Sequence, residues 1–151
     1  MARSKRAQGT SGSTRADVIL HVIAAVIAVL GLADATYLAV QFLTGEAVVC
    51  GGSAECSKVL GSGYARIGPV PIAAFGVLAY FAAFTCAVFA AFDYARMRRL
   101  FAIVVWAMFA VTLWLLFVQA VLLHAFCRYC LLSAALVFVL AAIVVLRPPA
   151  R

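Results

Sequence analysis

The stretch CRYCLLSAALVFVLAAIVVL, residues 127–146, decides the fold of this chain. Its part after the second cysteine, from Leu131 to Leu146, would span only about 24 Å as a helix. The hydrocarbon core of a bilayer is roughly 30 Å thick, so this part alone is too short to cross it. A helix that begins at Cys127 has the required length. The sequence therefore predicts a membrane-spanning helix whose first turn carries both cysteines.

Three further apolar runs precede this one: Val18–Leu43, Val70–Phe92 and Leu100–Leu123. The chain is 68% hydrophobic and 11% charged, with a mean hydropathy of +1.15, which is too apolar for an ordinary soluble domain. Short connections between the later runs favour antiparallel neighbours. We expect an all-α integral membrane protein, a four-transmembrane-helix bundle with a long external loop at residues 44–69 that contains a short helix. Residues 17–147 would form one catalytic domain between two cytoplasmic tails, a disordered basic one at 1–16 and a short one at 148–151.

Positive charge is placed unevenly about these runs. Nine of the twelve Lys and Arg residues fall on one side of the predicted membrane, and only Lys58, Arg66 and Arg128 fall on the other. The positive-inside rule then puts both termini in the cytoplasm and the loop cysteines outside, which excludes nucleic-acid binding as the reason for the net charge of +7. In a bacterium the outer face of the inner membrane is the oxidising side. A cleaved signal peptide ending near Ala33–Ala35 is the alternative, but apolar residues continue to Leu43.

The external loop is long enough to suggest a function of its own. Residues 47–50 look extended, Gly51–Gly52 forms a turn, and Ser53 is suited to cap a short helix. That helix would hold Cys56 on one face with Val59 and Leu60. The chain then re-enters the membrane, with Pro71 in the first turn of the next helix.

Five cysteines divide into Cys50 with Cys56, Cys127 with Cys130, and Cys86 alone. Cys86, in the middle of the second apolar run, reads as a small buried apolar side chain. At the start of a helix, unpaired N–H groups and the positive end of the dipole stabilise a thiolate, the form that attacks disulfides. Cys130 would lie about 4.5 Å deeper than Cys127. This difference suggests that Cys127 meets the loop and Cys130 meets a membrane-soluble oxidant.

Two other uses of the cysteines stay open. Four cysteines can bind structural zinc, although a six-residue ligand gap at a lipid boundary is unusual for such a site, so no metal is expected. They can also form two static disulfides in a structural membrane protein. The strained, reducible character of a C-x-x-C pair at a helix start weighs against the static role.

An ordered series of motifs runs through the chain: Cys50, Gly51-Gly52, Cys56-Ser57-Lys58-Val59, Ser62-x-Tyr64-Ala65, Gly68-x-Pro-x-Pro71, Phe75-Gly76 and Cys127-Arg128-Tyr129-Cys130. The series resembles the vitamin K epoxide reductase family, and specifically its bacterial quinone-linked branch that drives disulfide formation. The resemblance covers nearly everything from the first span to Leu146.

The resemblance implies a role for each matching residue. Cys130 would be the quinone-proximal cysteine and Cys127 its partner in the active-site disulfide. Cys56 would be the loop thiol that exchanges with Cys127, and Cys50 the one attacked by a thioredoxin-like oxidase. Ser62 matches the family's serine near the quinone site. The implied protein is a membrane thiol:quinone oxidoreductase with ubiquinone or menaquinone as electron acceptor, located in the bacterial cytoplasmic membrane.

Two positions of this sequence differ from the vertebrate members of the family. Ile72 stands where those enzymes carry a quinone-contacting Asn, and Ala134 stands where they carry a Tyr. Vertebrate-like epoxide reduction and anticoagulant sensitivity are therefore not expected. Because no thioredoxin domain is fused to this chain, the partner should be a separate protein in the periplasm or extracellular space. The other bacterial quinone-coupled disulfide family, the DsbB type, ranks second because it usually places its C-x-x-C in the first external loop.

Two polar residues near the thiols complete the predicted site. Asp34 lies within the first span, where an ionisable group is a functional candidate by default. It would exchange protons or hydrogen-bond the quinone ring, or else pair with a Thr or Gln of a neighbouring helix. His124 precedes Cys127 by one helical turn and would either tune its thiolate or sit among lipid headgroups.

Overall fold

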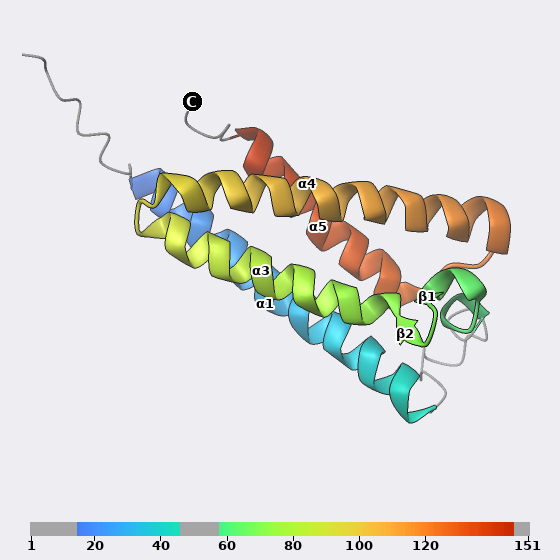
Figure 1. The fold of residues 1–151 in the computed structure, drawn as a ribbon. Coiled ribbons are helices and arrows are strands. Elements are labelled where there is room, and N and C mark those ends of the chain that lie inside the picture. Colours follow the sequence, from blue (N-terminus) through green and yellow to red (C-terminus); the bar gives the residue numbers. More distant parts are fainter. Residues whose placement is uncertain (1–14, 46–57, 147–151) are drawn as a thin grey trace, which may run out of the picture.

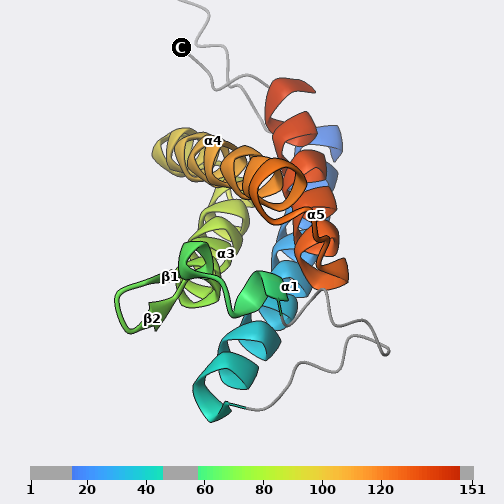
Figure 2. The ribbon, with the colours of Figure 1, turned by 90° about the vertical axis from the view of Figure 1, so that its right-hand side faces the viewer.

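A computed structural model of the protein describes residues 15–45 and 58–146. Four long helices are apolar enough to cross a membrane: α1 (Arg15–Thr44), α3 (Ile72–Ala91), α4 (Ala95–Phe117) with its π-helical continuation η2 (Val118–Leu123), and α5 (Arg128–Leu146) (Figure 1). Seen along the bundle, each helix packs against the next along the chain, and α5 returns to α1 (Figure 2). The predicted four-helix bundle is confirmed.

The helices differ from the predicted runs mainly at the start of α4. We expected this helix from Leu100, but it begins at Ala95 and takes the three arginines of the connection into its first turns. The turn before it is tight because Asp93 adopts a left-handed backbone conformation, with φ of 69°. Arginine is also a good helix former, so nothing in the local sequence opposes the earlier start.

The external loop returns to the membrane through a small hairpin that the sequence did not predict. Strands β1 (Arg66–Ile67) and β2 (Val70–Pro71) pair antiparallel about Gly68, which has a φ of 62°. Pro71 precedes the first helical residue of α3 and caps the helix instead of lying in its first turn. A 3₁₀ turn, η1 (Gly63–Ala65), comes before the hairpin, and residues 58–60 are helical, as expected for the end of the short loop helix.

Small residues allow α1 and α3 to approach closely. The buried faces of the two helices consist largely of Ala and Gly, namely Ala24, Ala28, Gly31 and Ala35 on α1 and Ala83, Ala87 and Ala90 on α3. A Cβ at Gly31 would overlap the ring of Tyr80, so only glycine fits there. Large apolar side chains such as Ile23 and Phe81 point outward, where lipid would cover them. This arrangement is typical of membrane helices, in which close packing rather than burial from water holds neighbours together.

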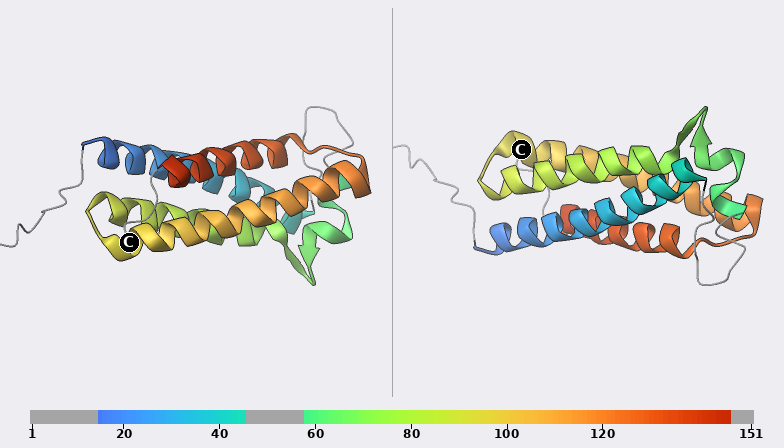
Figure 3. Two further views of the ribbon diagram at one scale, coloured as in Figure 1. Left: turned by 90° about the horizontal axis from the view of Figure 1, so that it is seen from above. Right: turned by 90° about the horizontal axis from the view of Figure 1, so that it is seen from below.

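The bundle has two distinct ends (Figure 3). One carries the hairpin, η1 and the linker from η2 to α5, and we call it the cysteine end. The other carries the first residues of α1, the turn from α3 to α4 and the last residues of α5, and we call it the turn end.

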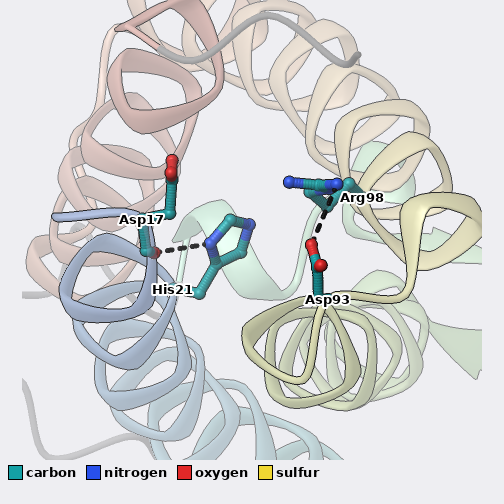
Figure 4. A network of polar contacts seen from close by, with 4 residues as sticks. All are labelled: Asp17, His21, Asp93 and Arg98. Atoms are coloured by element: carbon teal, nitrogen blue, oxygen red, sulfur yellow. Dashed lines mark hydrogen bonds and ion pairs between the residues drawn. The ribbon is translucent and has the colours of Figure 1, made fainter. Parts of the chain in front are cut away.

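Polar groups at the turn end pair with one another (Figure 4). The His21 ring nitrogen Nδ1 lies 2.8 Å from the carbonyl oxygen of Asp17, and the guanidinium of Arg98 lies 3.2 Å from the carboxylate of Asp93. His21 also packs against the ring of Phe101. These contacts join α1 to the start of α4 and close this end of the bundle.

Candidate functional site

Cys127 caps α5. Its carbonyl oxygen accepts the first helical hydrogen bond, from the N–H of Leu131 at 2.9 Å, so the helix begins with the motif as the span-length argument predicted. The backbone N–H groups of Tyr129 and Cys130 donate to its sulfur. A helix start leaves such N–H groups without backbone partners, and an N-cap side chain normally accepts from them. Here the capping atom is a redox-capable sulfur.

This environment favours the Cys127 thiolate. A hydrogen bond from the Cys130 thiol lowers the pKa of Cys127 to about 7, and the N–H groups of Cys130 and Tyr129 act in the same direction. Burial and the charge of Asp34 oppose the shift but do not cancel it. A larger fraction of Cys127 is therefore thiolate at neutral pH than for an ordinary cysteine, and thiolate is the attacking form in disulfide exchange.

A cavity of about 500 Å³ lies inside the bundle at the cysteine end. All four long helices and the loop segment around Val59 to Ala65 contribute to its lining. The lining is almost entirely apolar, and some of it, such as Phe75, Leu78 and Val111, consists of side chains that are also exposed on the outside of the bundle. The cavity therefore suits an apolar molecule that enters from lipid, and its volume is in the range of ordinary ligand sites.

The two cysteines of the motif face different surroundings. Cys130 lines the cavity, whereas Cys127 does not and is 0% exposed. Cys127 forms a small buried cluster with Ala125 and with Val59 of the external loop, and Cys130 packs against this cluster. The division of roles between the two sulfurs stays a prediction.

A few polar groups interrupt the apolar lining. Asp34 is 9% exposed, and its Oδ2 has no hydrogen-bond partner among the described residues. The expected bond from this oxygen to a Thr or Gln of a neighbouring helix is therefore absent from that part of the chain. Tyr80 reaches across from α3 to the Ser133 hydroxyl, 2.8 Å away. An unpaired carboxylate oxygen in an apolar cavity is costly, so it marks a place where a ligand or a proton is expected.

The other predicted residues have mixed outcomes. Ser62 lines the cavity, and its hydroxyl donates to the Val59 carbonyl at 2.7 Å. Cys86 is buried in the main core, as expected, and does not line the cavity. The helical spacing assumed for His124 is wrong, because this residue has a φ of 46° and ends η2 rather than continuing toward Cys127. Cys50 and Cys56 lie outside the described residues.

Gln119 and Tyr80 were missed as site residues. Gln119 is 3% exposed, lines the cavity, and accepts the N–H of Cys127 through Oε1 at 3.2 Å. The signal was present in the sequence, because Gln119 is an amide inside an apolar run and intramembrane polar residues are commonly functional. Little in the sequence indicated that Tyr80 belongs to the site, because an aromatic residue in a membrane helix is ordinarily a packing residue.

The sequence of this chain matches a known protein family. Residues 22–145 match the model of the vitamin K epoxide reductase family, a range that includes most of α1, all of α3 and α4, the cysteine motif and all but the last residue of α5. A search of curated proteins finds no match to the chain. A family match over this much of the sequence, together with the four membrane helices and the cavity beside Cys130, settles the broad class. The chain belongs to the vitamin K epoxide reductase family of membrane oxidoreductases, which couple thiol chemistry to quinones.

Proposed function

We propose that this member works in the direction of disulfide formation, passing electrons from a separate thioredoxin-like protein to a quinone in a bacterial cytoplasmic membrane. The observation that carries the proposal is that Cys130 lines the membrane cavity, whereas Cys127 is buried against the loop residue Val59. A dithiol with one sulfur on the cavity wall and the other buried beside the loop suits a relay. Two static disulfides would need no cavity beside one of them.

Electrons and protons balance along the proposed relay. The partner's thiolate attacks the Cys50–Cys56 disulfide at Cys50, and the partner leaves oxidised after its second thiol resolves the mixed disulfide. Cys56 then attacks Cys127 of the Cys127–Cys130 disulfide, and Cys50 resolves that intermediate. The reduced Cys127 and Cys130 finally give two electrons and two protons to the quinone, which becomes a quinol. Every step but the last is thiolate attack on a disulfide.

The chain's own residues meet the needs of that last step. The cavity is apolar enough for a quinone ring and large enough to hold it, while Cys130 provides a sulfur at its wall. The proton of the Cys130 thiol must leave as the new disulfide forms, and the unpaired Oδ2 of Asp34 in the same cavity is suited to receive it and return it to a quinone oxygen. Ser62 and the Tyr80–Ser133 pair are further hydrogen-bonding groups in reach of a ligand there.

The cavity offers little support for vertebrate-like epoxide reduction. Ile72 and Ala134, which replace the vertebrate Asn and Tyr, both line it. Neither side chain can donate a hydrogen bond to an oxygen of the ligand. The proposed substrate is therefore a quinone such as ubiquinone or menaquinone rather than an epoxide.

The proposed orientation places the turn end in the cytoplasm. Arg96, Arg98 and Arg99 all lie at the start of α4, and Arg15 begins α1 at the same end. The cysteine end, with only Lys58, Arg66 and Arg128, would face the periplasm or extracellular space, where disulfides persist. A thioredoxin-fold partner would dock there.

Quinone reduction by purified protein tests the proposal. The protein in lipid nanodiscs, supplied with dithiothreitol and a short-chain ubiquinone, should bleach the quinone catalytically. Cys130→Ala should abolish this activity, and Cys86→Ala should leave it unchanged because Cys86 is in the core away from the cavity. A wild-type protein that bleaches no quinone would support static disulfides instead.

A trapped intermediate tests the partner. In a Cys56→Ala variant, the Cys50 thiolate can attack the disulfide of an oxidised thioredoxin-fold partner, and only the partner's second thiol can then release the mixed disulfide. A covalent complex between Cys50 and a thioredoxin-fold protein should therefore be captured when cells are quenched with acid, and it should disappear in Cys50→Ala/Cys56→Ala. If no complex is trapped while quinone reduction is intact, the proposed relay through Cys50 is wrong and the proposed reduction of quinone stands.

A further inference from the structure

The linker that carries Cys127 depends on one buried amide. Helix α4 ends in the π-helical turn η2, and the chain reverses at His124 in a left-handed conformation. π-Helical turns are uncommon and concentrate at functional sites. The backbone carbonyl of Gln119 accepts hydrogen bonds from the N–H groups of His124 and Ala125, the latter at 3.2 Å. Gln119 therefore closes the end of α4 through its main chain.

The side chain of Gln119 makes a second connection. Its Oε1 accepts the N–H of Cys127 at 3.2 Å, eight residues along the chain. Both residues are buried, with 3% of Gln119 and 0% of Cys127 exposed. One amide thus ties the end of α4 to the cap of α5, and the tied residue is a redox cysteine.

Helix capping explains why this contact is needed. In a capping box, a Glu or Gln at the third helical position reaches back to the N–H of the capping residue. In α5 the cap is Cys127 and the third helical position is Cys130, whose short thiol cannot make that bond. Gln119 supplies the acceptor from the preceding helix, which leaves the third position free for the second redox sulfur.

Gln119 also faces the cavity. Its Oε1 is engaged by Cys127, and among the described residues none accepts a hydrogen bond from its Nε2. Two amide protons therefore remain available to an oxygen of a ligand in the cavity.

We propose that Gln119 is the positioning residue of this active site: it fixes the backbone of Cys127 through Oε1 and offers Nε2 to the ligand beside Cys130. This rests on the proposed quinone chemistry and adds a physical link between the two halves of the site. Without the link, Cys127 remains the capping residue of α5, but its sulfur is no longer held against the N–H groups and the Cys130 thiol.

Replacement by methionine tests the role, because Gln119→Met keeps the length of the side chain and removes both polar groups. The readout is the thiolate absorbance of reduced protein in a Cys50→Ala/Cys56→Ala/Cys86→Ala background, in which Cys127 and Cys130 are the remaining thiols. The titration midpoint should rise from about 7. A rise of about one unit would lower the thiolate fraction at pH 7 about fivefold. The matched control is Gln41→Met, a glutamine of α1 that does not line the cavity, and its midpoint should not move.

A second substitution separates positioning from packing. A protonated glutamic acid has one oxygen to accept from Cys127 and one O–H to donate into the cavity. In mildly acidic buffer, Gln119→Glu should therefore reduce quinone at nearly the wild-type rate measured at the same pH, whereas Gln119→Met should be slower with a higher KM for quinone. The other titratable groups around the cavity, Asp34, Tyr64, Tyr80 and Cys130, are common to both variants.

The outcomes are distinguishable. If Gln119 only fills space, Gln119→Met will reduce quinone as fast as the wild type and as Gln119→Glu, which would overturn the proposal. An unmoved thiolate midpoint in Gln119→Met would also overturn it. Because the thiolate titration needs no quinone, it remains informative even if wild-type protein fails to reduce quinone, which is the result that would refute the proposed function.

Discussion

The polar groups at the two ends of the bundle face different surroundings. At the turn end, His21 is bonded to the backbone of Asp17, and Arg98 is paired with Asp93, although its Nε has no hydrogen-bond partner among the described residues and Arg98 does not line the cavity. At the cysteine end, the Oδ2 of Asp34 has no partner among the described residues and faces a cavity. Paired groups hold helices together, whereas unpaired groups in a cavity are available for chemistry. Substitutions at the turn end should therefore change stability, and those at the cysteine end should change activity.

The largest expected effect is at Asp34. Asp34→Asn keeps the shape of the side chain and removes its ability to carry a proton, so quinone reduction should fall about a hundredfold, in the lower range for loss of a general acid or base. Steady-state bleaching of quinone measures this, and thermal unfolding in detergent checks that the fold persists. The control is Thr36→Val on the same helix, where the hydroxyl is exposed and bonds only to its own helix. An unchanged rate and pH dependence in Asp34→Asn would remove the proton role.

The next largest effect is on packing between α1 and α3. Gly31→Ala places a methyl group against the ring of Tyr80 and should destabilise the protein by about 1–3 kcal/mol. Gly76→Ala is the matched change on the facing helix, where a Cβ would lie 3.4 Å from the Cβ of Ala35, and it should cost less. Equal losses of melting temperature in the two variants would contradict the close contact at Gly31.

A smaller effect concerns the pH dependence of Cys127. Because its pKa lies at about 7, thiolate should increase about tenfold between pH 6 and pH 8. An ordinary thiol, with a pKa of about 8.5, stays mostly protonated over that range. The thiolate absorbance of reduced Cys50→Ala/Cys56→Ala/Cys86→Ala protein should rise accordingly and level off above about pH 8, whereas that of an ordinary thiol would still be rising. The lowered pKa of Cys127 also stabilises the folded protein. This stabilisation is fully present above pH about 8.5, where the thiol of the unfolded chain ionises, and it is lost as the pH falls through about 7.

The smallest effect is expected at the turn end. Asp93→Asn breaks the ion pair with Arg98 and keeps a residue that tolerates a φ of 69°. The side chains are 43% and 22% exposed, so the loss should be below about 1 kcal/mol. Quinone reduction should not change. A loss of activity at constant stability would mean that the turn end takes part in the chemistry after all.

The sequence predicted the helices well and the cavity poorly, for physical reasons. Each membrane helix must satisfy its backbone internally over the full bilayer thickness, so apolar length alone located the spans and indicated that α5 starts at the C-x-x-C motif, where Cys127 caps it. The role of Gln119 depends on η2 and on the reversal at His124, which arise from packing between helices. The ring of Tyr80 meets Ser133 only because Gly31 leaves room for it, and no local pattern encodes such a contact between residues 53 positions apart.

The central claim is that Cys130 faces the quinone and Cys127 faces the loop. Its most direct test uses reduced Cys50→Ala/Cys56→Ala protein in nanodiscs without oxygen, mixed with one equivalent of ubiquinone. Quinone absorbance and the Cys127–Cys130 disulfide are measured in the same sample. We predict one disulfide for each quinol formed, and neither product when Cys130→Ala is added. Quinol that still forms without Cys130, or without a matching disulfide, would contradict the account.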